Sequence, residues 1–217
     1  MKLIEKFEVH DKLNPKLWDE NFNLKDGIKE KLLAIVDDFA SDLILPIVIV
    51  DVQLVGSNAS FNYTDNSDLD VHIIANFDKS LYNLSKEELQ NIYLLNRTKY
   101  NDKYDITIHG IPVELYVEDM ITGAISNGVY SLFDNRWIKF PKKIELAHDI
   151  DVSNEFDKWK EQIEKSESKT GRAEQLLNRI YLIRKNSISI DGEFGKGNAL
   201  FKELRNAGLL DKLRDIV

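Results

Sequence analysis

The 217-residue sequence contains no cysteine, so it can form neither a disulfide nor a cysteine-ligated zinc site. Its histidines lie far apart along the chain and lack the close spacing of metal ligands. The longest apolar run, residues 43–50, is interrupted by Pro46 and is far too short to span a bilayer. The first residues, MKLIEKFEVHDK, include acids and lack the apolar segment of a signal peptide. We therefore expect a cytoplasmic protein without a membrane-spanning segment.

The charge of the chain is unevenly distributed. The formal net charge is −8, yet residues 160–217 hold 12 lysines and arginines against 9 acids, whereas residues 1–159 hold 17 against 28. A broad nucleic-acid-binding surface is normally basic, so the acidic first part argues against one. The basic end is suited to contact a triphosphate or a short RNA.

Length and composition suit one core domain with a smaller helical part. A hydrophobic content of 43% is enough to bury a core. The pattern turns helical late in the chain, so we expect a core domain over residues 1–148 and a helical C-terminal part over residues 149–217. The expected fold class is α/β (α+β), with a small mixed β-sheet and helices packed on one of its faces.

Apolar periodicity and turn residues predict the elements of this fold. A short helix is expected near Pro15, because proline is tolerated in a first turn, and Ser85 predicts a capped helix start. The expected longer helices cover residues 27–43, 85–100, 154–166, 170–188 and 199–206. The expected strands cover residues 47–56, the segment with Asp68 and Asp70, a hairpin over 105–117, and short strands near 129–132 and 137–140.

One stretch, residues 50–76, reads as a strand, the pair Gly56-Ser57, a polar loop and a second strand that carries Asp68 and Asp70. Side chains alternate along a strand, so these two acids are expected on one face. Two carboxylates on a rigid strand repel each other unless a cation neutralises them. The pattern therefore indicates a divalent-metal site.

A third acid, Glu114, interrupts the apolar strand PVELYV. If that strand lies beside the one carrying Asp68 and Asp70, three carboxylates converge. Mg²⁺ takes oxygen ligands of this kind and keeps positions for water and phosphates. Two such ions can clamp the attacking and leaving oxygens of a phosphoryl displacement.

Residues that suit a phosphate group surround these acids. Gly56 permits a tight turn and close approach of phosphate to backbone N–H groups, and Ser57 offers a hydroxyl. Ser67, which directly precedes Asp68, is expected to orient a carboxylate through its hydroxyl, and His72 is expected on the face of the two aspartates. A small basic patch outside the motif, where phosphate contact is also expected, consists of Lys139, Lys142 and Lys143.

The pattern of Gly56-Ser57, ten intervening residues, Asp68-Leu-Asp70 between apolar strands and a later Glu114 resembles the nucleotidyltransferase superfamily of DNA polymerase beta. The resemblance covers residues 28–117. It implies that the Gly-Ser turn holds a nucleoside triphosphate such as ATP. It also implies that Asp68 and Asp70 bind two Mg²⁺ or Mn²⁺ ions, and that Glu114 completes the shell of the catalytic ion.

The later part of the chain adds two resemblances. In that superfamily a C-terminal helical part often contributes cations near the nucleotide, which implies this role for Arg179 or Arg184. The segments GVYSL and GEFGKGNALFKELR are similar to uncharacterised phage-type proteins, so a phage-type minimal nucleotidyltransferase is the member that the chain resembles. The second resemblance implies no activity of its own.

The reaction that these features imply moves a nucleoside monophosphate from a triphosphate to an acceptor hydroxyl and releases pyrophosphate. The acceptor stays open among an RNA end such as tRNA, a protein side chain and a small molecule. One alternative is a catalytically silent nucleotide- or partner-binding module of the same fold. A metal-dependent phosphoesterase is another, and the acids of an edge strand can also be simply solvated.

Overall fold

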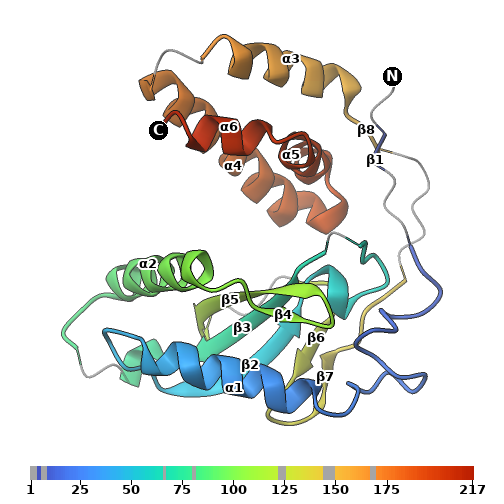
Figure 1. Ribbon diagram of the computed structural model, residues 1–217, viewed down its shortest axis with the longest axis vertical. Coiled ribbons are helices and arrows are strands. Elements are labelled where there is room, and N and C mark those ends of the chain that lie inside the picture. The colour runs from blue at the N-terminus through green and yellow to red at the C-terminus, as the bar shows by residue number, and fades with distance from the viewer. Residues whose placement is uncertain are drawn as a thin grey trace. The chain divides into compact units, whose positions relative to one another are not determined.

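The structure is a computed structural model that describes residues 4–5, 9–65, 67–79, 82–121, 126–143, 150–166 and 170–217 (Figure 1). The chain forms two compact units, one of residues 8–144 and one that joins residues 1–7 to residues 145–217. The division predicted from the sequence falls instead after residue 148, with the N-terminal residues in the core domain.

The larger unit is built on a six-stranded sheet with the strand order β4-β5-β3-β2-β6-β7 (Figure 1). The strands are β2 (Ile49–Val55), β3 (Leu69–Ala75), β4 (Thr107–Ile108), β5 (Ile111–Asp119), β6 (Val129–Ser131) and β7 (Arg136–Lys139). β3 and β5 run parallel, and the other neighbouring pairs are antiparallel. The predicted mixed sheet is therefore confirmed, and the fold is α+β.

Two helices, α1 (Ile28–Ser41) and α2 (Lys86–Lys103), belong to this unit. α1 forms because apolar residues recur at helical spacing and are buried together. α2 begins at the predicted residue, where Ser85 and Glu88 form a reciprocal capping box. The two helices meet where the rings of Phe39 and Tyr100 lie 5.2 Å apart, edge to face. They pack on the same face of the sheet, as predicted.

Alternation along the strands separates an apolar face from a polar one. Leu69, Val71 and Ile73 of β3 point into the core with the helices. The opposite face of the sheet, which we call the polar face, carries Asp51, Gln53, Asp70, His72, Glu114, Tyr116, Glu118 and Ser131. His72 therefore lies on the face predicted for it.

The short helix predicted near Pro15 is wrong. The segment instead forms a turn in which the Asn14 carbonyl accepts hydrogen bonds from the N–H groups of Leu17, at 3.0 Å, and Trp18, at 2.9 Å. The Asn14 side chain also accepts from the Lys16 N–H at 3.0 Å. An asparagine that bonds the backbone two residues on stabilises a turn in competition with a helix.

The smaller unit is helical, as predicted for the C-terminal part. It contains α3 (Ser153–Glu164), α4 (Thr170–Asp191), α5 (Lys196–Asn206) and α6 (Leu209–Arg214), and β1 (Ile4–Glu5) pairs antiparallel with β8 (Ile150–Asp151). α4 and α5 approach closely at Gly197, whose N–H donates to the Ser187 hydroxyl at 3.0 Å. A side chain at Gly197 would collide with α4, so glycine is needed at this contact.

Candidate functional site

Asp70 and Glu114 lie side by side on the polar face. The parallel pairing of β3 with β5 sets Asp70 at the level of Glu114 and His72 at the level of Tyr116. Registered residues of neighbouring strands share a face, so the two carboxylate-bearing side chains project the same way. The expectation that the Glu114 strand lies beside the Asp70 strand is confirmed.

Gly56 packs directly against the Asp70 carboxylate. The antiparallel pairing of β2 with β3 sets Val55 opposite Asp70, and Gly56 follows with φ 72° and ψ −160°. L-residues avoid this combination of angles. A Cβ at this position would also overlap a carboxylate oxygen of Asp70. Two separate observations therefore require glycine here.

The turn after Gly56 brings the two predicted serines together. Residues Ser57–Ala59 form a single 3₁₀ turn. The Ser57 hydroxyl donates to the Ser67 hydroxyl at 2.8 Å, and the Thr64 N–H also donates to Ser67, at 2.9 Å. Ser67 thus ties both ends of the polar loop. Asp68 follows one residue before β3 begins, and it is half-buried.

Asn58 organises this turn, and the sequence analysis missed it. Its side-chain amide donates to the carbonyls of Ser67, at 3.1 Å, and Asp68, at 2.8 Å. Its side-chain oxygen accepts from the Asn14 amide at 2.7 Å, and its carbonyl accepts from the Trp18 indole at 2.8 Å. Asn58 is only 1% exposed. The one signal in the sequence is its position directly after the Gly-Ser pair.

Replacement of Asn58 by alanine should destabilise the larger unit by about 3 kcal/mol, because several buried polar groups lose their partners at once. Urea unfolding followed by tryptophan fluorescence would measure the loss. Asn21→Ala, at an exposed position, is the matched control and should change stability by less than about 0.5 kcal/mol. An equal effect of the two substitutions would contradict the role given to Asn58.

Lys139 of the predicted basic patch is linked to the Gly56 turn through Ser126. The Gly56 N–H donates to the Ser126 hydroxyl at 3.0 Å. The ammonium group of Lys139 donates to the Ser126 carbonyl at 2.5 Å. The structure therefore brings a lysine of β7 near the turn. Lys143 of the same patch instead pairs with Asp11.

Glu114 is held by two neighbours that the sequence analysis did not assign to the site. The Arg97 guanidinium of α2 lies 3.3 Å from Glu114 Oε2 and 3.9 Å from the centre of the Tyr116 ring. The Tyr116 hydroxyl donates to the same Oε2 at 2.5 Å. Burial, and after it the negative charges of Asp70 and Glu114, raise the pKa of Tyr116 well above its ordinary value.

His72 continues this polar row on β3. Its Nδ1 lies 3.2 Å from Glu118 Oε2, and its ring centre lies 4.9 Å from that of Tyr116. The side chains of His72 and Glu118 are mostly buried, at 14% and 28% exposure. The row therefore extends the polar face along β5 beyond Glu114.

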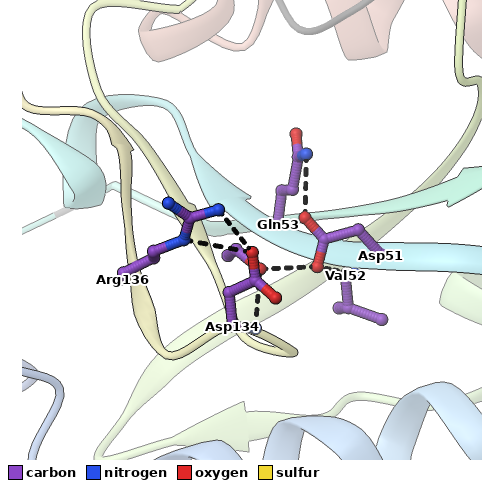
Figure 2. A network of polar contacts seen from close by, with 6 residues as sticks. Asp51, Val52, Gln53, Asp134 and Arg136 are labelled. Carbon is purple, nitrogen blue, oxygen red and sulfur yellow. Dashed lines mark hydrogen bonds and ion pairs between the residues drawn. The ribbon is translucent and has the colours of Figure 1, made fainter.

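At the other end of the polar face, the polar side chains form hydrogen bonds and an ion pair with one another, as Figure 2 shows. Asp51 accepts hydrogen bonds from the Ser131 hydroxyl at 2.7 Å and from the Gln53 amide at 3.0 Å. Ser131 accepts in turn from the Asp134 N–H at 3.0 Å, and Asp134 pairs with Arg136 at 2.9 Å. Asp51 is thus engaged in fixing the β2-β6-β7 edge, apart from the Asp70 and Glu114 pair.

Arg179 and Arg184 lie in the helical unit, where the described contacts are with its own residues. The Arg179 guanidinium lies 5.3 Å from the centre of the Trp159 ring, and that of Arg184 lies 4.3 Å from the centre of the Phe201 ring. Arg184 also donates from Nε to the Asn198 side chain at 3.3 Å. These contacts join the helices of that unit, and the nucleotide role of both arginines stays a prediction.

The donor set suits a divalent cation in its chemistry. Asp68, Asp70 and Glu114 offer the carboxylate oxygens that Mg²⁺ and Mn²⁺ prefer, and Gly56 has no side chain that would displace the Asp70 carboxylate packed against it. Within the described residues, no three histidine, cysteine or acidic side chains are grouped as they would be around an ion. In this structure Glu114 is engaged by Arg97 and Tyr116 instead.

Comparisons of the chain with models of known protein families, with curated proteins and with solved structures gave no match. In the part of the chain that the structure describes, no helix combines the length and apolar character needed to cross a membrane.

Proposed function

We propose that the protein is a metal-dependent nucleotidyltransferase of the polymerase beta-like type. It would move a nucleoside monophosphate from a triphosphate to an acceptor hydroxyl and release pyrophosphate. The observation that carries the proposal is the register of β3 and β5, which sets Asp70 beside Glu114, with the side-chain-free Gly56 against Asp70. Asp68 lies two residues before Asp70, and the Gly56 turn closes the end of the neighbouring strand.

Asp68, Asp70 and Glu114 would hold the Mg²⁺ or Mn²⁺ ions, two in the superfamily that the sequence resembles. When bound, such ions neutralise charge on the reacting phosphate and lower the pKa of the acceptor hydroxyl. The protein's own contribution is to keep Asp70 and Glu114 at the same level of two rigid neighbouring strands. On metal binding, Glu114 would give up its contacts with Arg97 and Tyr116.

The triphosphate would lie along the Gly56 turn. The missing side chain at Gly56 makes room for the Asp70 carboxylate, and the Ser57 hydroxyl, which donates to Ser67 in this structure, would rotate toward a phosphate oxygen when the triphosphate binds. Lys139, linked to the turn through Ser126, would supply positive charge. These groups bind and orient the substrate, which is the larger part of catalysis in phosphoryl transfer.

In the reaction, the acceptor oxygen forms a bond to the α-phosphorus while the bond from that phosphorus to the bridging oxygen breaks. Pyrophosphate leaves with the electron pair, and the acceptor proton is lost to solvent. The acceptor would be an RNA end such as that of tRNA, a protein side chain or a small-molecule hydroxyl.

Incubation with α-labelled triphosphates, Mg²⁺ or Mn²⁺, and total cell RNA or protein should transfer label to an acceptor. A γ-labelled triphosphate should instead release its label as pyrophosphate, and a chelator should stop both. No transfer and no pyrophosphate from any of the common triphosphates would contradict the proposal. Metal-dependent nucleotide binding without turnover would indicate a silent module, and hydrolysis of phosphodiesters would indicate a phosphoesterase.

A further inference from the structure

We propose that Arg97 serves as a counter-cation for the Glu114 carboxylate. The Arg97 guanidinium competes with the divalent ion for this carboxylate, so metal binding stays weak until a triphosphate is present. The inference rests on the proposed metal site. It concerns a residue from α2 rather than from the strands that carry the acids.

The position of Arg97 is fixed by the packing of its helix, α2, against the sheet. The apolar side of α2 packs on the core face through Leu89, Tyr93 and Tyr100. Gln90 donates to the Val117 carbonyl at 2.8 Å, so α2 runs along the edge of β5. About two helical turns further along, Arg97 reaches past this edge to Glu114 on the polar face.

Glu114 Oε2 is shared by two donors. Arg97 lies 3.3 Å from it and the Tyr116 hydroxyl 2.5 Å from it. The guanidinium also lies over the Tyr116 ring, a contact that favours a cation in this place. A metal ion bound to Glu114 would stand within a few ångströms of this guanidinium, and like charges at that range repel.

The Arg97 guanidinium is nevertheless not held by a full set of hydrogen bonds. Arg97 Nε is buried and has no hydrogen-bond partner among the described residues, whereas a fully structural arginine normally satisfies its planar set of donors. Its side chain is 21% exposed and that of Glu114 is 38% exposed. The pair can therefore separate at modest cost. A triphosphate offers the released guanidinium a matched anionic partner.

A purely structural role for Arg97 predicts something different. If Arg97 only anchored α2 to β5, its replacement would lower the free energy of unfolding and leave metal affinity unchanged. α2 already has its buried apolar side and the Gln90 contact for this purpose. Metal affinity in the absence of turnover is therefore the measurement that separates the two roles.

The test is Arg97→Gln in the full chain, with Mn²⁺ as the probe and free Mn²⁺ measured by electron paramagnetic resonance. Without nucleotide, the variant should bind Mn²⁺ about tenfold more tightly than the wild type, because a competing ligand and a like charge are both removed. Addition of a non-hydrolysable triphosphate should tighten Mn²⁺ binding less in the variant than in the wild type.

Two further variants make the result specific. Lys99→Gln removes the same charge from an exposed position on the same helix and should leave Mn²⁺ affinity unchanged. Arg97→Lys keeps the charge but loses the planar donor set, so it should give an intermediate affinity. It also serves as the test variant if Arg97→Gln does not fold.

Each outcome decides one question. If the wild type binds Mn²⁺ and Arg97→Gln binds it equally or more weakly, the inference is overturned and the proposed function is untouched. Binding by Arg97→Gln alone would support the inference strongly. If neither protein binds Mn²⁺, with or without triphosphate, the proposed metal site and this inference fall together.

Discussion

Asp70→Asn should reduce nucleotidyl transfer by roughly a thousandfold or more while the protein stays folded. Asparagine keeps the size of the side chain and removes its charge, so the fit against Gly56 is retained. A thousandfold loss corresponds to about 4 kcal/mol of transition-state stabilisation, which is the size of effect expected if Asp70 is the metal ligand proposed above. Pyrophosphate release with a labelled triphosphate measures it.

The stability of this variant should not fall, since Asp70 lies beside Glu114 on the same face and removal of one of two neighbouring negative charges relieves repulsion. Thermal unfolding would show an unchanged or higher midpoint. Asp37→Asn on the exposed side of α1 is the control, and it should keep full activity. If Asp70→Asn kept more than about a tenth of the wild-type turnover, the proposed role of Asp70 as a metal ligand would be contradicted.

The faces of the sheet were predictable because strand alternation is a local property. Leu69, Val71 and Ile73 are apolar and alternate with Asp70 and His72, so the sequence alone separates the core side from the polar side. The start of α2 was predictable for the same reason, because the capping box is contained within four residues. Both predictions needed no knowledge of distant contacts.

The pairing of β3 with β5 was a condition of the predicted site, and the sequence did not itself predict this pairing. Sequence reasoning required that the Glu114 strand lie next to the Asp70 strand, and nothing in the local pattern fixed the register. The register is set once α2, which packs on β5, buries its apolar side in the shared core and so positions that strand. That step depends on tertiary packing rather than on propensity.

The residues that support the site could not be found from the sequence because their partners are distant. Asn58 bonds Asn14 across 44 positions, and Gly56 bonds Ser126 across 70. Arg97 and Glu114 are 17 positions apart on different elements. A polar residue with such partners looks like any solvated residue until the chain is folded.

Gly56→Ala should strongly destabilise the larger unit, although it adds only one methyl group. The residue has φ 72° and ψ −160°, a combination open essentially to glycine, and the added Cβ would overlap the Asp70 carboxylate. Backbone strain and displacement of Asp70 act together, so we expect a loss of about 3 kcal/mol or more in unfolding free energy. Transfer activity should also fall by at least about a hundredfold, since a small misplacement of a reacting group is costly.

Gly27→Ala provides the matched control for this substitution. Gly27 also has a positive φ, 76°, but its ψ of −8° is near the left-handed helical region, and no atom lies within 4 Å of the position that a Cβ would take. This change should cost only about 1 kcal/mol and leave activity unchanged. Urea unfolding and pyrophosphate release, measured on both variants, separate the general cost of a positive φ from the specific contact with Asp70. Equal stability and equal activity in the two variants would show that the turn does not hold the carboxylate, and the geometric basis of the proposed site would be lost.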